Sequence, residues 1–232
     1  EERHFEGIAL SEDGTVLAIG AVLNSDNGYR SGQVQVYEFE NNSWSLIGSS
    51  INGEASGDMF GSSIAMSNDG KIIAVGAPEN DGNGTNSGSV RVFQNNNGNW
   101  TQLGSDIDGE AANDASGENI ALSSDGMTLA IGATQNDAPV SQNYNNAGHV
   151  RVFRYSSGSW SQLGSDIDGA SGGDQSGSAV SLSSDGNIIA IGAWEHDYEA
   201  NYPNPRTGQV RIFQYQNSNW SQIGADIDGE ME

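Results

Sequence analysis

The chain repeats one sequence pattern four times along its 232 residues, and this repetition constrains the fold more than any other feature. Each copy opens with an apolar stretch, a Ser-x-Asp-Gly turn and a second apolar stretch, over residues 8–21, 64–77, 120–133 and 180–193. One tryptophan stands near the end of each copy, at Trp44, Trp100, Trp160 and Trp220, with separations of 56, 60 and 60 residues. A period of this length predicts a solenoid, a propeller or an array of stacked units.

Each copy has the pattern of four short antiparallel strands. In the second copy we expect strands over residues 62–67, 71–77, 88–94 and 100–107. An Asp-Gly turn between the first two favours a tight hairpin, because glycine accepts a positive φ without steric cost. The sequence therefore predicts an all-β fold, a β-propeller built of four tandem four-stranded antiparallel repeats, or blades. A solenoid of β-hairpins is the alternative. We expect a single domain with repeats of about 1–54, 55–110, 111–170 and 171–232.

The second copy also resembles a known repeat family. Phe60-Gly61, then Gly-Ala-Pro at 76–78, then GSVRVF at 88–93 are similar to the FG-GAP repeat of integrin-α-like β-propellers. The resemblance extends to all four copies, although Ser116 and Ser176 replace the phenylalanine in the last two. Blades of that family often carry a D-x-D-x-D-G calcium loop between the first two strands. Short Ser-x-Asp-Gly turns stand there in this chain, so calcium sites of the integrin type are not expected.

Composition limits the function classes. The formal net charge is −23 and Lys71 is the only lysine, so the surface repels nucleic acid and anionic membranes and attracts cations. The sequence contains no cysteine, which excludes disulfides and thiol chemistry, and no apolar run long enough to span a membrane. Its opening residues are too polar for a signal peptide, so we expect any export signal to be removed or to lie outside this sequence.

The loop between the second and third strands grows from ten residues in the first two copies to fourteen in the last two. Length variation confined to one loop marks the face that is free to acquire function. Aromatic and polar side chains concentrate there, and we expect a ligand to contact Tyr144, Trp194, His196, Tyr198, Tyr202 and Arg206. Flat rings beside polar groups suit either glycan recognition or a protein hot spot. The alternative is that Trp194 folds back to cover apolar surface.

Acidic links join each copy to the next on the same face. We name as candidate metal ligands Asp106, Asp108, Asp166, Asp168, Asp226 and Asp228. Together with Glu110 and Asp114 they could hold a hard cation such as Ca²⁺, or they could simply cap turns and face water. His149 has the position of an ordinary strand residue. The recurring arginines, Arg91, Arg151 and Arg211, are interpreted as structural partners of carboxylates on neighbouring strands rather than as a cationic ring.

The number of residues that would join the end of the sequence to its start equals that in an internal junction. We therefore expect Met231 and Glu232 to lie close to Glu1 and Glu2, which would close the ring. Two chains sharing one ring as a homodimer, or a longer array, are the alternatives.

These patterns favour binding over catalysis. Three histidines are scattered, and Glu195, His196 and Asp197 form the only dense titratable group that breaks the repeat. The prediction is a non-enzymatic, secreted or cell-surface binding or adhesion module for a glycan or protein. A structural repeat domain of a larger surface protein is the alternative, with a hydrolase third.

Overall fold

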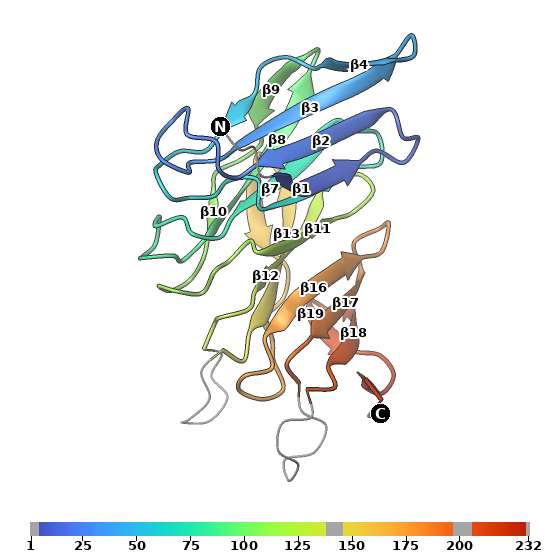
Figure 1. Cartoon of the computed structure of the whole chain (residues 1–232). Coiled ribbons are helices and arrows are strands. Elements are labelled where there is room, and N and C mark those ends of the chain that lie inside the picture. The colour runs from blue at the N-terminus through green and yellow to red at the C-terminus, as the bar shows by residue number, and fades with distance from the viewer. Residues whose placement is uncertain (1–4, 138–145, 197–205, 231–232) are drawn as a thin grey trace.

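A computed structural model describes residues 5–137, 146–196 and 206–230, which form strands and turns and no helix. The strands make four antiparallel sheets, each inside one of the repeats expected from the sequence (Figure 1). The first contains β1 (Phe5–Leu10), β2 (Val16–Ala21), β3 (Gln33–Glu40), β4 (Ser43–Leu46) and β5 (Ile51–Asn52). The second contains β6 (Ser63–Met66), β7 (Ile72–Ala77), β8 (Ser89–Asn96), β9 (Asn99–Gln102) and β10 (Ile107–Asp108). The third contains β11 (Asn119–Leu122), β12 (Thr128–Ala133), β13 (His149–Ser156), β14 (Ser159–Gln162) and β15 (Ile167–Asp168). The fourth contains β16 (Ser176–Leu182), β17 (Ile188–Ala193), β18 (Gln209–Gln216), β19 (Asn219–Gln222) and β20 (Ile227–Asp228).

The fourth strand of each blade is interrupted, which corrects the expected continuous strand. In blade two, β9 and β10 both pair with β8, and residues 103–106 between them leave the regular ladder. Gly104 causes the interruption, because its φ of +81° is left-handed and incompatible with an extended strand. Leu103 still donates its backbone N–H to Val92 O at 2.8 Å, so the two pieces remain on one line.

The predicted hairpins between the first two strands are confirmed, and side chains hold them closed. In blade two, Ser67 Oγ donates to Asp69 Oδ1 at 2.8 Å and accepts the backbone N–H of Ile72 at 3.0 Å. Asp69 also accepts the N–H of Lys71 at 3.0 Å. The first, third and fourth copies repeat this set of bonds. The Ser-x-Asp-Gly pattern is therefore a turn motif whose carboxylate binds its own backbone.

Neighbouring blades pack face to face. Buried apolar residues of blades one and two form one core cluster, those of blades two and three a second, and those of blades three and four a third. Near the inner strands the backbones touch: a Cβ built on Gly76 would collide with the carbonyl oxygen of Gly117 in the next blade. Glycine at this position therefore allows the backbones of neighbouring blades to approach closely in the inner part of the fold.

Two polar side chains tie each of blades two, three and four to the blade before it. Tryptophan indoles donate to backbone carbonyls of the preceding blade, through Trp100 to Ile47 O, Trp160 to Leu103 O and Trp220 to Leu163 O, at 3.2, 2.7 and 2.6 Å. Arginines do the same, through Arg91 to Asn52 O, Arg151 to Asp108 O and Arg211 to Asp168 O, at 2.9, 2.7 and 2.6 Å. The arginines are structural, as expected, but their shortest contacts are with carbonyls rather than with carboxylates.

The four blades form an open arc, and blades one and four lie at its opposite ends (Figure 1). Closure by the chain ends is therefore wrong for this structure; the four terminal residues named for it lie outside the described residues. The outer faces confirm the opening. Ile51, Ile107 and Ile167 are 8, 6 and 4% exposed beneath the next blade, whereas their counterpart Ile227 is 57% exposed.

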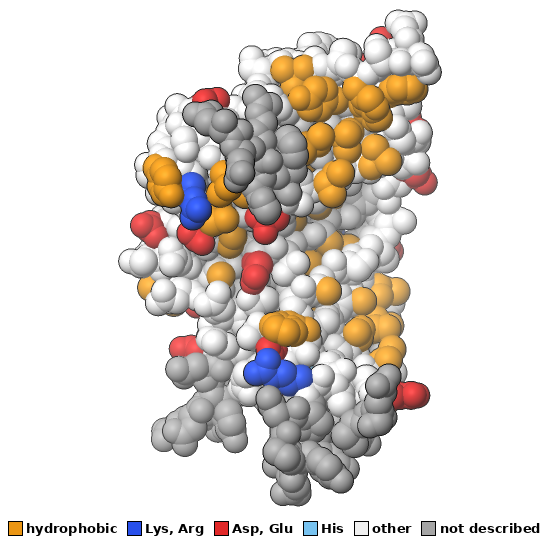
Figure 2. Space-filling model, viewed as in Figure 1, with side chains coloured by type: hydrophobic (Ala, Val, Ile, Leu, Met, Phe, Trp, Pro, Cys, Tyr) orange, Lys and Arg blue, Asp and Glu red, His pale blue; other side chains and the backbone are white. Residues whose placement is uncertain are grey.

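Blade one is uncovered on its other side, where Ile8 and Leu10 are 68 and 55% exposed. Hydrophobic side chains gather on this end of the molecule in Figure 2. An isolated end blade exposes an apolar sheet because each repeat needs two neighbours to bury both faces. No helix in the described part of the chain is long and apolar enough to cross a membrane.

Candidate functional site

A polar residue opens the third strand of every blade and faces the acidic link that follows. In blade one, Gln33 Nε2 donates to Asn52 Oδ1 at 2.9 Å and to Asp26 Oδ2 at 3.0 Å. In blade four, Gln209 Nε2 donates to Asp228 Oδ1 at 3.0 Å. The counterparts in blades two and three are Ser89 and His149. The position is buried in all four blades, so the identity of this residue sets the chemistry at each link.

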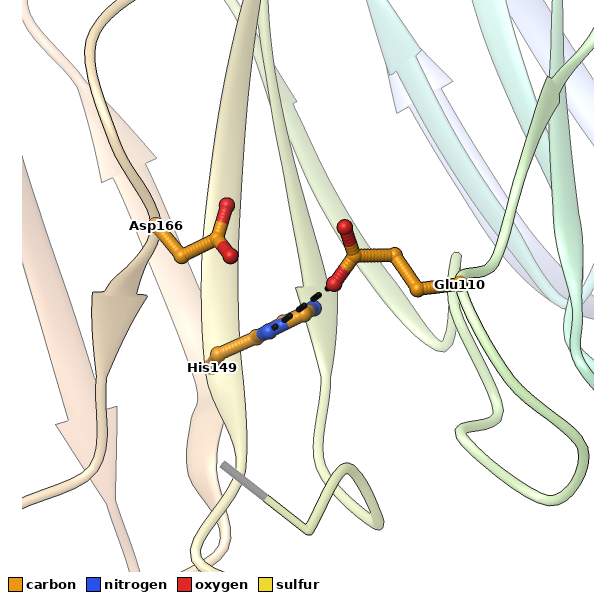
Figure 3. A group of neighbouring side chains, drawn as sticks. All are labelled: Glu110, His149 and Asp166. Carbon is orange, nitrogen blue, oxygen red and sulfur yellow. Dashed lines mark ion pairs between the residues drawn. The ribbon is translucent and has the colours of Figure 1, made fainter. Parts of the chain in front are cut away.

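In blade three this position brings a histidine between two carboxylates. Figure 3 shows Glu110, His149 and Asp166 pointing toward one another from three segments of the chain. His149 Nδ1 lies 3.8 Å from Glu110 Oε2, and one potential ligand atom from each of the three residues lies within 4.8 Å of the others. His149 is 2% exposed, whereas Glu110 and Asp166 are exposed. The cluster thus combines a buried imidazole with two carboxylates on the solvent-exposed side.

Burial and charge shape the protonation of this cluster. Burial, followed by the positive charge of Arg151, lowers the pKa of His149 to about 4, so its imidazole is neutral near pH 7. Burial also raises the pKa of Glu110; Arg151 opposes this effect, and Asp166 adds to it by like-charge repulsion. The site therefore offers a free imidazole lone pair beside carboxylates that repel one another.

The six aspartates predicted as metal ligands lie in the links, and the isoleucine between each pair is buried in the blades that a neighbour covers. The first aspartate of each link accepts a bond from a glutamine of the same blade: Gln102 to Asp106, Gln162 to Asp166 and Gln222 to Asp226, at 2.5, 2.6 and 2.5 Å. Among the described residues, Asp166 alone of the six joins a group of three potential ligands; Asp106, Asp108, Asp168, Asp226 and Asp228 do not.

The aspartates that follow the links are buried turn residues. Asp114 accepts the backbone N–H of Ala111 at 2.9 Å and the amide of Asn136 at 3.0 Å. In blade four the same pattern places His196 Nδ1 3.0 Å from Asp174 Oδ2, while its Nε2 lies 3.0 Å from Gln209 Nε2. His196 therefore occupies the place of a structural asparagine and contacts Asp174 and Gln209; its predicted role as a ligand contact stays a prediction.

A groove of about 870 Å³ runs from the inner strands to the open side of blade four. Its lining includes Glu118, Asn119 and Thr134 from blade three, and Gln175 and Trp194 from blade four and the link before it. Trp194 is 56% exposed, and its indole N–H donates to Gln175 Oε1 at 2.9 Å. The alternative that this ring folds back over the core is therefore wrong: the tryptophan stands open and oriented at the groove.

The remaining residues predicted to contact a ligand divide into two groups. Arg206 forms an ion pair with Glu195, with Nε at 2.6 Å from Oε2, and its Nη1 donates a hydrogen bond to Oε1 at 2.7 Å. That pairing fixes the end of the fourth loop and leaves the guanidinium half exposed. Tyr144, Tyr198 and Tyr202 lie outside the described residues.

The fold and the polar link positions define a β-propeller whose blades form an open arc. Its second blade is similar to the FG-GAP repeat, since a family model described as FG-GAP repeat matches residues 52–93. This confirms the resemblance in the second copy, where the Phe-Gly and Gly-Ala-Pro motifs are both present. FG-GAP repeats are typical of extracellular proteins. A search of curated proteins found no significant match.

Solved structures agree on the fold. A protein from Bacteroides uniformis, named provisionally as a 6-phosphogluconolactonase, aligns with a TM-score of 0.64 at 13% identity over 99% of this chain and 56% of its own. The β-propeller domain of the Trilobed protease from Pyrococcus furiosus aligns at 0.54 and 10% identity, over 98% and 59%. The WD40 repeats of RRP9 align at 0.56 and 13% identity, over 96% and 52%. The chain thus spans about half the length of the structures it matches, and identities this low show the fold alone.

Sequence reasoning missed the role of His149 because the residue fits a strand pattern. One signal was available in the sequence. The other three copies have Gln33, Ser89 and Gln209 at this position, so the histidine breaks the repeat. Glu110 was named as a possible ligand, but together with the link aspartates and Asp114 rather than with His149.

Proposed function

We propose that this propeller is an extracellular binding module that recognises a carbohydrate in the groove beside Trp194. The observation that carries the proposal is the exposed indole of Trp194, held by Gln175 at the wall of the groove. A flat apolar ring can pack against the C–H face of a sugar, while neighbouring polar groups bind hydroxyls. A binding site of this kind combines an apolar surface with a few placed polar groups.

Polar groups of blade three line the same groove. The Thr134 hydroxyl donates to Glu118 Oε2, which orients the carboxylate, and Asn119 lies beside it. The lining of the groove therefore combines an oriented acceptor and an amide with an aromatic ring. A ligand with many hydroxyls and one apolar face matches this arrangement better than a fully apolar one.

Binding is favoured over hydrolysis by the state of the loop residues. Glu195 is paired with Arg206, and His196 is held between Asp174 and Gln209. Two of the three side chains of this titratable group therefore bind other residues of the protein, and the third, Asp197, lies outside the described residues. A purely structural role is disfavoured because an exposed tryptophan fixed by a hydrogen bond adds nothing to inter-blade packing.

The test is a glycan array probed with the wild-type protein, Trp194→Ala and Trp44→Ala. Trp44 is the matched control, since it is 44% exposed on the far end blade and does not line the groove. We expect a subset of glycans to bind the wild type and Trp44→Ala but not Trp194→Ala. Absence of any glycan binding, or equal binding by all three proteins, would reject carbohydrate recognition at this groove and favour a protein ligand or a structural role.

A further inference from the structure

We propose that Glu110, His149 and Asp166 bind one divalent transition-metal ion of the Zn²⁺ type, at a site separate from the groove. The three residues come from the link before blade three, the first position of β13 and the link after it. An ion there would tie both ends of one blade together. The proposal does not depend on the carbohydrate-binding function.

The first argument is the state of His149. Its side chain is 2% exposed, and among the described residues its ring nitrogens make no hydrogen bond; the ion-pair contact of Nδ1 with Glu110 Oε2 is 3.8 Å long. Buried polar groups in folded proteins are almost always satisfied by a partner. In Figure 3 the ring points at the space between the two carboxylates, which is where an ion would sit.

The second argument is the ligand set. One imidazole nitrogen and two carboxylate oxygens suit Zn²⁺ and related ions, whereas Ca²⁺ takes six to eight oxygens. Ligand atoms around a tetrahedral zinc lie roughly 3.4 Å apart, given bond lengths of about 2.0–2.2 Å. The ligand atoms now lie within 4.8 Å of one another. They reach the tetrahedral spacing if the oxygens of the two exposed carboxylates each move inward by about 1 Å while the buried imidazole stays in place.

Arg151 helps to place one carboxylate. Its Nη1 lies 3.9 Å from Glu110 Oε1, and its Nη2 donates to Asp108 O at 2.7 Å. The guanidinium thus faces one oxygen of Glu110, while the other oxygen, Oε2, faces His149. This division leaves Oε2 available to an ion.

The repeat supplies an internal comparison. In blade two the same places hold Glu54, Ser89 and Asp106, and the two carboxyl groups lie close enough for Asp106 to raise the pKa of Glu54, after burial as the main cause. The carboxylate pair is therefore present without the nitrogen ligand. In blade four Ala170 and Gln209 replace the glutamate and the histidine. Blade three alone of these three combines all three ligands.

The experiment is isothermal titration of the metal-free protein with Zn²⁺ and, separately, with Ca²⁺, at an ionic strength of about 0.15 M to screen diffuse attraction to the acidic surface. His149→Gln removes the nitrogen, and it should fold because glutamine occupies this place in blades one and four. His196→Asn is the matched control, since it restores the asparagine found in blades two and three without touching the cluster.

We expect one Zn²⁺ per chain in the wild type and in His196→Asn, and affinity at least about tenfold lower in His149→Gln and in Asp166→Asn. Ser89→His should add a second site with Glu54 and Asp106 and raise the stoichiometry to two. Unchanged Zn²⁺ affinity in a folded His149→Gln variant would overturn the proposal. Loss of the site in His196→Asn, or Ca²⁺ binding as tight as Zn²⁺ binding, would also overturn it.

Discussion

Four isoleucines occupy the same place in the four links, and we predict that truncating them has unequal effects. Ile167 is 4% exposed beneath blade four, whereas Ile227 is 57% exposed on the open side of the arc. The local sequence Asp-Ile-Asp-Gly is the same around both residues. Any difference in the free energy of unfolding between Ile167→Ala and Ile227→Ala is therefore caused by the neighbouring blade and not by the local strand.

The magnitudes follow from burial. Truncating a buried isoleucine to alanine costs about 2–5 kcal/mol, because the lost transfer free energy is joined by the cost of a cavity. Ile167 packs in the cluster between blades three and four, so we expect a loss of about 3 kcal/mol there. Truncating Ile227 leaves no cavity, because its side chain is less than half buried. The expected loss in free energy of unfolding for Ile227→Ala is therefore only its share of the transfer free energy, roughly 1 kcal/mol.

The assay is urea unfolding of the wild type, Ile167→Ala, Ile227→Ala and Ile51→Ala, followed by tryptophan fluorescence and circular dichroism. Ile51, which is 8% exposed, is the buried control at the other end of the arc. It should behave like Ile167 because blade two covers it. Equal losses in free energy of unfolding for Ile167→Ala and Ile227→Ala would refute the open arc, since that result requires blade four to be covered as well.

Two further outcomes test other parts of the structure. The pKa of His149 falls to about 4 in the folded protein from an unfolded value of 6.5, so the stability it contributes is present above pH 6.5 and is lost as the pH falls from 6.5 to 4. In EDTA, the free energy of unfolding of the wild type should fall by about 3 kcal/mol more than that of His149→Gln as the pH drops from 6.5 to 4. Urea unfolding at each pH measures this difference. Parallel pH profiles of the two proteins would contradict the prediction. Phe60 is 1% exposed, and the centroid of its ring lies 4.3 Å from the Arg91 guanidinium carbon. Phe60→Ala should lower the free energy of unfolding by about 4 kcal/mol. Ser116→Ala at the equivalent place, where the buried hydroxyl has no partner among the described residues, should cost less than about 1 kcal/mol, and similar losses for the two variants would show that Phe60 is not a core residue.

The sequence alone determined the blade and its order along the chain. The Ser-x-Asp-Gly turns, the glycines of the inner strands and the recurring tryptophans are local signals that repeat in phase, and each fixes a hairpin or a packing position without reference to distant residues. A single copy such as 64–77 was therefore enough to predict its strands. The break at Gly104 was missed, because one glycine inside an apolar pattern does not reveal a left-handed φ.

Only the tertiary structure decided what lies on each side of a blade. Ile167 and Ile227 have the same local sequence, yet one is buried and the other open, because burial depends on whether a neighbouring blade is present. Glu110, His149 and Asp166 are separated by 39 and 17 positions in the sequence and meet only when two links flank the start of β13. Their chemistry arises from packing: burial leaves the imidazole neutral, and the adjoining links bring the two carboxylates to it.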